Sequence, residues 1–126
     1  MTQTGKGLGT DFERWLGKML RKGHFTALIV LVRIAEPRLE PLRSTFVHVV
    51  GDELDWGDIV LLLRGAGVSW DGAAFFPTRE DGGLVPDELA RARLRELEAA
   101  LDQDRLVLNK GEFFDVWGRR LEVAEA

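Results

Sequence analysis

The sequence contains no cysteine, and this absence removes several classes of protein. A disulfide framework, a thiol nucleophile and a zinc or iron–sulfur site with cysteine ligands are all excluded. Long apolar runs are also missing: the most apolar stretch, residues 25–32, is far shorter than the roughly 18 residues that suggest a membrane span. The N-terminus does not carry the apolar segment of a signal peptide either. We therefore expect a soluble cytoplasmic protein without a membrane span.

Catalytic and cofactor motifs are equally scarce. Residues 5–9 read G-x-G-x-G, which is neither the dinucleotide pattern G-x-G-x-x-G nor a P-loop, so we expect residues 1–9 to form a flexible leader. The chain has neither an H-E-x-x-H metal motif nor the order of serine, histidine and aspartate that is typical of hydrolases. The sequence thus predicts no cofactor and assigns no catalytic residue.

Charge is unevenly distributed along the 126 residues. The net charge is −4, yet the first 24 residues carry five basic and two acidic side chains, so the excess of acid lies in the rest of the chain. An acidic body argues against general nucleic-acid binding, because phosphate contacts need clustered lysine and arginine. A basic N-terminal helix on an acidic body is instead compatible with a protein partner or an anionic surface.

Capping and turn signals divide the chain into elements. Thr10 begins the pattern of a capping box, which predicts an amphipathic basic helix over residues 10–23. Asp55, with Asp58 three residues later, predicts the start of a second helix, and Asp87 begins the longest one. We expect strands at residues 25–34, 45–50, 72–76, 106–108, 113–114 and 121–123.

This order of elements predicts an α+β fold. The strand–helix–strand unit between residues 45 and 76 indicates one right-handed parallel crossover, and the C-terminal strands indicate a short antiparallel meander. The prolines within residues 36–41 are expected to interrupt the ladder, because proline has no N–H to donate. We therefore expect a single domain over residues 10–126, in which about three helices cover a small mixed β-sheet.

Each of the four tryptophans has a glycine within the next two positions, a composition typical of chain corners. Near the last corner, Phe113 and Phe114 are adjacent in an expected strand, so they must point to opposite faces. One of them, or Trp117, is therefore expected at the surface beside two arginines, as in hot spots of protein interfaces. Together with the apolar edge of the N-terminal helix, this predicts a partner-binding surface made of Phe12, Trp15, Phe114, Trp117, Arg119 and Arg120.

An acidic group offers a second interpretation. In a strand–helix crossover the end of the strand faces the start of the next helix, where ligands commonly bind. Converging carboxylates at that point could hold a hard cation or act as acid and base, with a histidine in support. Helix capping and a solvated loop explain the same carboxylates without any ligand. The residues of this alternative site are His48, Asp52, Asp55, Asp58 and Asp71.

These features favour a non-catalytic interaction module, that is, an accessory or regulatory subunit that binds a larger protein partner or associates with itself. The first alternative is a small metal-binding or ligand-binding enzyme that uses the acidic crevice. The second alternative is an acidic inhibitor of the antitoxin or immunity type, which would cover a basic site on another protein. None of the three hypotheses includes nucleic-acid binding, and the residues do not specify a small-molecule ligand.

Overall fold

The computed structural model describes residues 9–35, 38–51 and 54–121. Within these ranges the elements are α1 (Asp11–Leu20), β1 (Phe25–Ala35), β2 (Arg38–Val49), α2 (Trp56–Arg64), β3 (Gly72–Thr78), α3 (Asp87–Gln103), the 3₁₀ helix η2 (Arg105–Lys110) and β4 (Glu112–Asp115). The expected leader over residues 1–9 lies outside the described residues except for Gly9. No helix in the described ranges combines the length and the apolar character that a membrane crossing requires.

The capping box expected at Thr10 is present, and the helix start expected at Asp55 is a capping box as well. The hydroxyl of Thr10 accepts a hydrogen bond from the N–H of Glu13, and the carboxylate of Glu13 accepts one from the N–H of Thr10. Asp55 and Asp58 form the same reciprocal pair at the start of α2. Each pair satisfies backbone N–H groups that have no partner inside the first helical turn. The local sequence therefore determines where these two helices begin.

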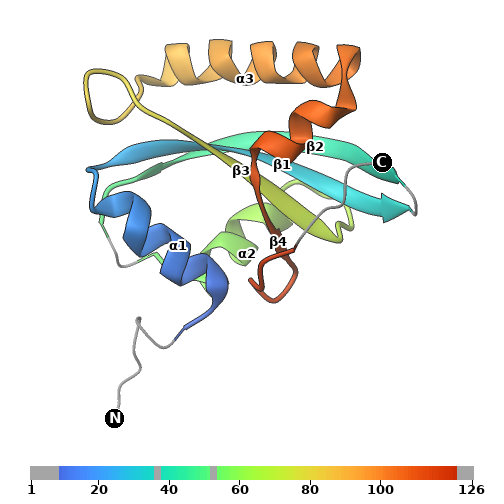
Figure 1. Ribbon diagram of the computed structural model, residues 1–126, viewed down its shortest axis with the longest axis horizontal. Coiled ribbons are helices and arrows are strands. Elements are labelled where there is room, and N and C mark those ends of the chain that lie inside the picture. The colour runs from blue at the N-terminus through green and yellow to red at the C-terminus, as the bar shows by residue number, and fades with distance from the viewer. Residues whose placement is uncertain (1–8, 36–37, 52–53, 122–126) are drawn as a thin grey trace.

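The sheet is antiparallel and has the strand order β2-β1-β3-β4 (Figure 1). β1 pairs with β2 on one side and with β3 on the other. Its residues 25–32 are all buried, as expected for a continuous apolar run in a central strand. The α+β prediction is confirmed. The sheet is antiparallel where a mixed sheet was expected, because β1 lies between β2 and β3 and keeps these two co-directional strands apart.

β2 is longer than the sequence pattern indicated, because Pro41 belongs to it. The register of the β1–β2 ladder shifts between Leu31 and Val32: Leu31 pairs with Arg43, and Val32 pairs with Pro41. Proline is tolerated at such bulges and on edge strands, where its missing N–H breaks no ladder bond. The prediction that prolines interrupt the ladder is therefore wrong over residues 38–41, while residues 36–37 lie outside the described part of the chain.

The C-terminal part also differs from the expected meander. Residues 105–110 form η2 and not a strand, and its first turn is capped by Asp104, whose side chain accepts from the N–H of Leu106 at 3.0 Å. β4 follows, and an isolated antiparallel bridge joins Phe114 to Arg120. Of the strand expected at 121–123, only Leu121 is described.

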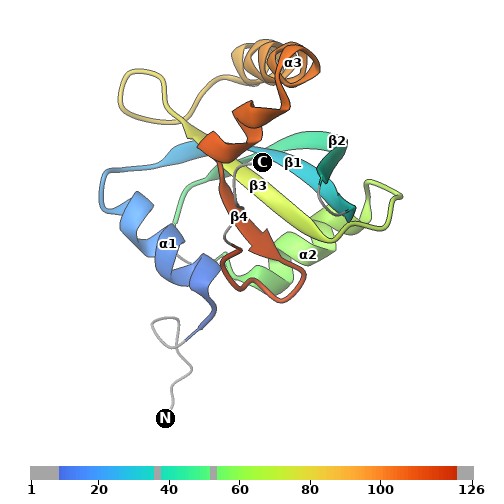
Figure 2. The same ribbon diagram turned by 45° about the vertical axis from the view of Figure 1, so that its right-hand side comes forward.

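The sheet separates two apolar cores. α1 and α2 cover one face of the sheet, and α3 with η2 covers the other (Figure 1, Figure 2). The first core holds a cluster of aromatic rings from Phe12, Trp15, Phe25, Trp56, Phe75 and Phe114. The second core is smaller and contains Val30, Val32, Ala74, Leu101, Leu108 and Phe113. Alternation along each strand therefore sends neighbouring side chains into different cores.

Candidate functional site

Half of the predicted partner-binding residues belong to the first core. Phe12 and Phe114 are 1% and 0% exposed, and their rings meet edge to face with centroids 5.4 Å apart. Trp15 is 7% exposed and packs against Phe25 in the same cluster. The apolar edge of α1 is therefore covered by the protein's own sheet. This corrects the expectation that Phe12, Trp15 and Phe114 lie on a surface open to a partner.

Phe113 and Phe114 point to opposite faces of β4, as the alternation requires. Both rings are nevertheless buried, because each face of the sheet has its own helical cover. Trp117 is the aromatic residue left outside, with 65% of its surface exposed. Among the described residues, the candidate surface is therefore the turn that follows β4, comprising Trp117, Arg119 and Arg120.

The turn from Asp115 to Gly118 is held in a fixed shape by its own hydrogen bonds. One carboxylate oxygen of Asp115 accepts from the backbone N–H groups of Trp117 and Arg119, each at 2.9 Å. The N–H of Gly118 donates to the carbonyl of Asp115 at 3.0 Å. Gly118 has a φ of +80°, which favours glycine, and its carbonyl accepts from the N–H of Phe12. The turn is thus fastened to the start of α1.

A cation stacks on the exposed indole. The guanidinium carbon of Arg119 lies 4.8 Å from the ring centroid of Trp117, and its Nε donates to Asp115 at 2.9 Å. Burial alone would raise the pKa of the Asp115 carboxyl, but the two backbone N–H groups and the Arg119 guanidinium outweigh it, and the net pKa is lowered. The carboxylate therefore stays ionised and orients Arg119 across the indole face.

Arg120 connects the turn to its surroundings. Its backbone N–H donates to the carboxylate of Asp11 at 2.8 Å, and its side chain pairs with Glu112 and lies over the ring of Phe114. The bond to Arg120 is the main cause that lowers the pKa of Asp11. The supporting role of Asp11 was not among the sequence predictions, whereas a turn at Asp115 was expected. The Asp–x–Trp–Gly spacing signals the Asp115 turn, whereas no local pattern signals a contact across 109 positions.

The acidic group of the alternative site does not converge in the described residues. Asp55 and Asp58 serve the capping box of α2. The carboxylate of Asp71 accepts from the N–H of Ile34 at 2.7 Å, where it joins the start of β3 to the end of β1. Asp52 lies outside the described residues. No group of three or more potential metal ligands is found in the part of the chain that the structure describes.

His48 forms a hydrogen-bonded chain with two residues that no sequence pattern connects to it. Its Nδ1 lies 2.8 Å from the hydroxyl of Thr26, and its Nε2 lies 2.6 Å from the carboxylate of Asp87. The bond from His48 is the main cause that lowers the pKa of Asp87. The order hydroxyl, imidazole, carboxylate is that of a hydrolase triad. Thr26 is 0% exposed and also accepts from the N–H of Val85, so the chain of bonds is structural.

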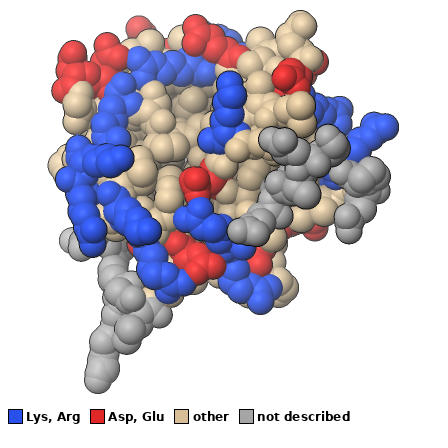
Figure 3. All heavy atoms as spheres, in the orientation of Figure 1, with Lys and Arg blue, Asp and Glu red and all other residues tan. Residues whose placement is uncertain are grey.

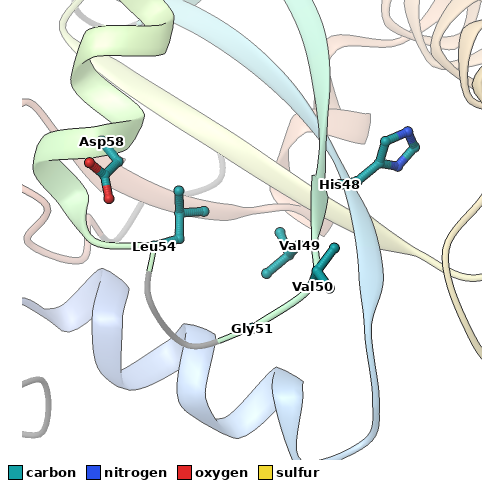
Figure 4. Close-up of a pocket in the computed structure, with 6 residues that line it drawn as sticks. All are labelled: His48, Val49, Val50, Gly51, Leu54 and Asp58. Atoms are coloured by element: carbon teal, nitrogen blue, oxygen red, sulfur yellow. The ribbon is translucent and has the colours of Figure 1, made fainter.

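A shallow hollow of about 470 Å³, open to solvent, lies at the end of β2. The lining consists of His48, Val49, Val50 and Gly51 on one side and of Leu54 and Asp58 on the other (Figure 4). The ring of His48 points away from this hollow, toward the α3 side of the sheet. His48 and Asp58 therefore both border the hollow, but the imidazole is bound to Thr26 and Asp87 and does not face Asp58.

Lysine and arginine side chains gather around a depression lined by uncharged residues on the face shown in Figure 3. Two arginines in the region between α1, β3 and α3 are already occupied by acceptors of the chain. Arg79 donates to the carbonyl of Met19 at the end of α1, and Arg93 donates to Thr78 and Glu80. These two cations therefore stabilise the fold.

Comparisons with known proteins add no further constraint. No family model, curated protein sequence or solved structure matches this chain. These comparisons therefore assign no function to the chain.

Proposed function

We propose that this protein is a non-catalytic interaction module that docks on a protein partner through the turn after β4. The surface consists of Trp117 and Arg119, with Arg120 at its edge. The observation that carries the proposal is the 65% exposure of a tryptophan on a turn whose backbone N–H groups at Trp117 and Arg119 are held by the Asp115 carboxylate. Trp117 keeps a large part of its indole in water although Arg119 stacks on one face of the ring, and a partner would remove that apolar area from water.

The fixed backbone makes the turn suitable for binding. Asp115 already fixes the backbone of the turn, so association would order few additional dihedral angles. Tryptophan and arginine are the residue types that most often dominate the binding energy of protein interfaces. A partner with an apolar pocket and a carboxylate beside it would cover the indole of Trp117 and pair with the exposed guanidinium of Arg119.

The proposal is tested by a double substitution, Trp117→Ala with Arg119→Ala. We expect the double variant to lose the partners that the wild-type protein retains in affinity purification from the native host, because the buried contact area and the cation are both removed. Partners and their stoichiometry are measured by mass spectrometry. Circular dichroism and thermal unfolding establish that both proteins are folded.

A matched control comes from α2. Leu61 is 64% exposed, which is nearly the exposure of Trp117, but it lies on a different element. We expect the Leu61→Ala variant to recover the same partners as the wild-type protein. If the wild-type protein recovers none, or if the double variant recovers the same set, the proposed role of the turn is wrong.

A further inference from the structure

The two edges of the sheet differ in how they are protected. At the β4 edge, the carbonyl of Phe113 accepts from the N–H of Leu121, and the N–H of Asp115 donates to the carbonyl of Arg119. The segment after the turn therefore covers that edge. At the opposite edge, β2 pairs with β1 only. Unpaired edge strands are templates for pairing with another chain, and proteins normally blunt them.

Alternation in an antiparallel ladder shows which backbone groups of each strand point outward. Because Phe113 and Asp115 bond to the covering segment, the alternate residues of β4 bond to β3. The β1–β3 and β1–β2 registers carry this alternation across the sheet to β2. There the backbone N–H and C=O groups of Ser44, Phe46 and His48 point away from β1. Pro77 gives an independent check, since the same pattern turns it away from β1, where its missing N–H breaks no bond.

The outward backbone groups of β2 are protected against pairing with another strand over only part of its length. Beyond the bulge, the same alternation places Pro41 at an outward position, where it removes a donor from the edge. No proline, lysine or bulge protects residues 44–48. Within the described ranges, the backbone groups of Ser44, Phe46 and His48 have no hydrogen-bond partner. Residues 44–48 therefore present a row of unpaired backbone N–H and C=O groups at the edge of the sheet.

We infer that a second copy of this chain pairs with β2, so that two sheets join across a two-fold axis at Phe46. In this register, Ser44 of each protomer lies opposite His48 of its partner, and Phe46 lies opposite Phe46. The N–H and C=O of all three residues then find partners, and the proline at position 41 stays outside the paired stretch. A two-fold axis makes the contact closed and prevents further growth of the sheet.

Charge complementarity supports this register. Arg43 lies on the α1/α2 face, because it pairs with the buried Leu31 of β1. The two-fold places Arg43 directly opposite Val49 of the second copy, in a pair whose side chains approach closely. Val49 borders the hollow that also contains Asp58 (Figure 4). Arg43 is exposed and has no ion pair among the described residues, so the hollow offers it an apolar wall and a carboxylate.

This surface is separate from the docking turn. The turn follows β4, and β2 lies at the other end of the strand order. Self-association and partner binding can therefore be measured independently, and the failure of one leaves the other unaffected.

The first experiment measures the molar mass of the full chain by light scattering over a dilution series. We expect a concentration-dependent dimer for the wild-type protein. Ser44→Pro removes an outward N–H but no bond within the sheet, so we expect a folded monomer. Ser44→Ala keeps that N–H and should remain dimeric. A monomeric wild-type protein, or a dimer that persists in Ser44→Pro, overturns the inference.

The second experiment does not depend on how well a proline is tolerated. Arg43→Glu and Asp58→Lys each place like charges together at both contacts of the dimer, and we expect each variant to dimerise about tenfold more weakly. In a mixture of the two variants, one contact joins the introduced glutamate to the introduced lysine, and the other joins Arg43 to Asp58. A heterodimer should therefore form with restored affinity, and native mass spectrometry distinguishes the species by mass. If the mixture forms no more dimer than the separate variants, the register is wrong.

Discussion

Gly118 lies where the turn after β4, α1 and α2 meet. Its φ of +80° is in the region that favours glycine, and it is buried. A Cβ at this position would lie 2.8 Å from Cγ of Trp56 and 3.1 Å from Cβ of Thr10. Glycine is therefore required for two independent reasons, backbone conformation and close packing.

We predict that Gly118→Ala lowers the free energy of unfolding by about 2–4 kcal/mol, the sum of left-handed strain and overpacking. Gly67→Ala is the matched control, because Gly67 has a φ of +73° but nothing within 4 Å of an added Cβ. Strain alone should lower its stability by about 1–2 kcal/mol. Denaturant unfolding measures both variants. Equal losses would show that the contact with Trp56 is not a constraint.

Single residues also show the limit of sequence reasoning about the site. The Asp115–Gly118 corner could be predicted, because aspartate and glycine at that spacing act on their own backbone. The burial of Phe12 and Trp15 could not be predicted with it. An amphipathic helix shows which face is apolar, but the identity of what covers that face depends on contacts far apart in sequence.

At the scale of elements, helix starts were predictable and strand partners were not. Both capping boxes act within three residues, so the patterns at Thr10 and Asp55 were sufficient. The position of β1 between β2 and β3 depends on pairing across the whole sheet, which strand order along the chain does not determine. Pro41 was misleading, because a proline at an outward edge position lets the ladder continue, here with a register shift between Leu31 and Val32. Residues 105–110 have an apolar pattern too short to distinguish a strand from a helical turn.

Thr26, a buried residue of β1, connects this strand to β2 and to the segment just before α3. Its hydroxyl lies 2.8 Å from Nδ1 of His48 on β2 and accepts from the N–H of Val85, just before α3. Both Thr26 and Val85 are fully buried. Any change that removes this oxygen therefore leaves polar groups unsatisfied away from water.

We predict that Thr26→Val lowers the free energy of unfolding by about 1–3 kcal/mol, because the N–H of Val85 and the ring of His48 lose their partner. Thr26→Ser keeps the hydroxyl and loses one methyl group, which costs about 1 kcal/mol. Amide hydrogen exchange separates the two effects. The N–H of Val85 should exchange faster in the valine variant than in the serine variant at matched global stability. Equal exchange would exclude the hydroxyl as its acceptor.

At the scale of the whole molecule, three aspartates accept hydrogen bonds that hold α1, α3 and the turn after β4 in place. Asp11 on α1 binds the N–H of Arg120, Asp87 on α3 binds His48, and Asp115 fastens the exposed turn. The pKa of each of these carboxyls is lowered in the folded protein from the ordinary value of 3.8. Protonation of these carboxylates at low pH therefore weakens the contacts of α1, of α3 and of the turn after β4 over the same pH range.

The direction of the pH dependence follows from these lowered pKa values. Between the folded pKa and 3.8 the unfolded chain binds more protons, so the stability from these groups is complete above 3.8 and is lost as pH falls through the folded pKa values.

We predict that the triple variant Asp11→Asn, Asp87→Asn, Asp115→Asn is less stable than wild type at pH 7 but loses less stability on acidification. The two curves should converge at the lowest pH. Denaturant unfolding from pH 7 to about pH 2 measures this. Asp102→Asn, on the exposed side of α3, is the control and should follow the wild-type curve. Parallel curves for the triple variant would mean that these three carboxylates do not couple protonation to the fold.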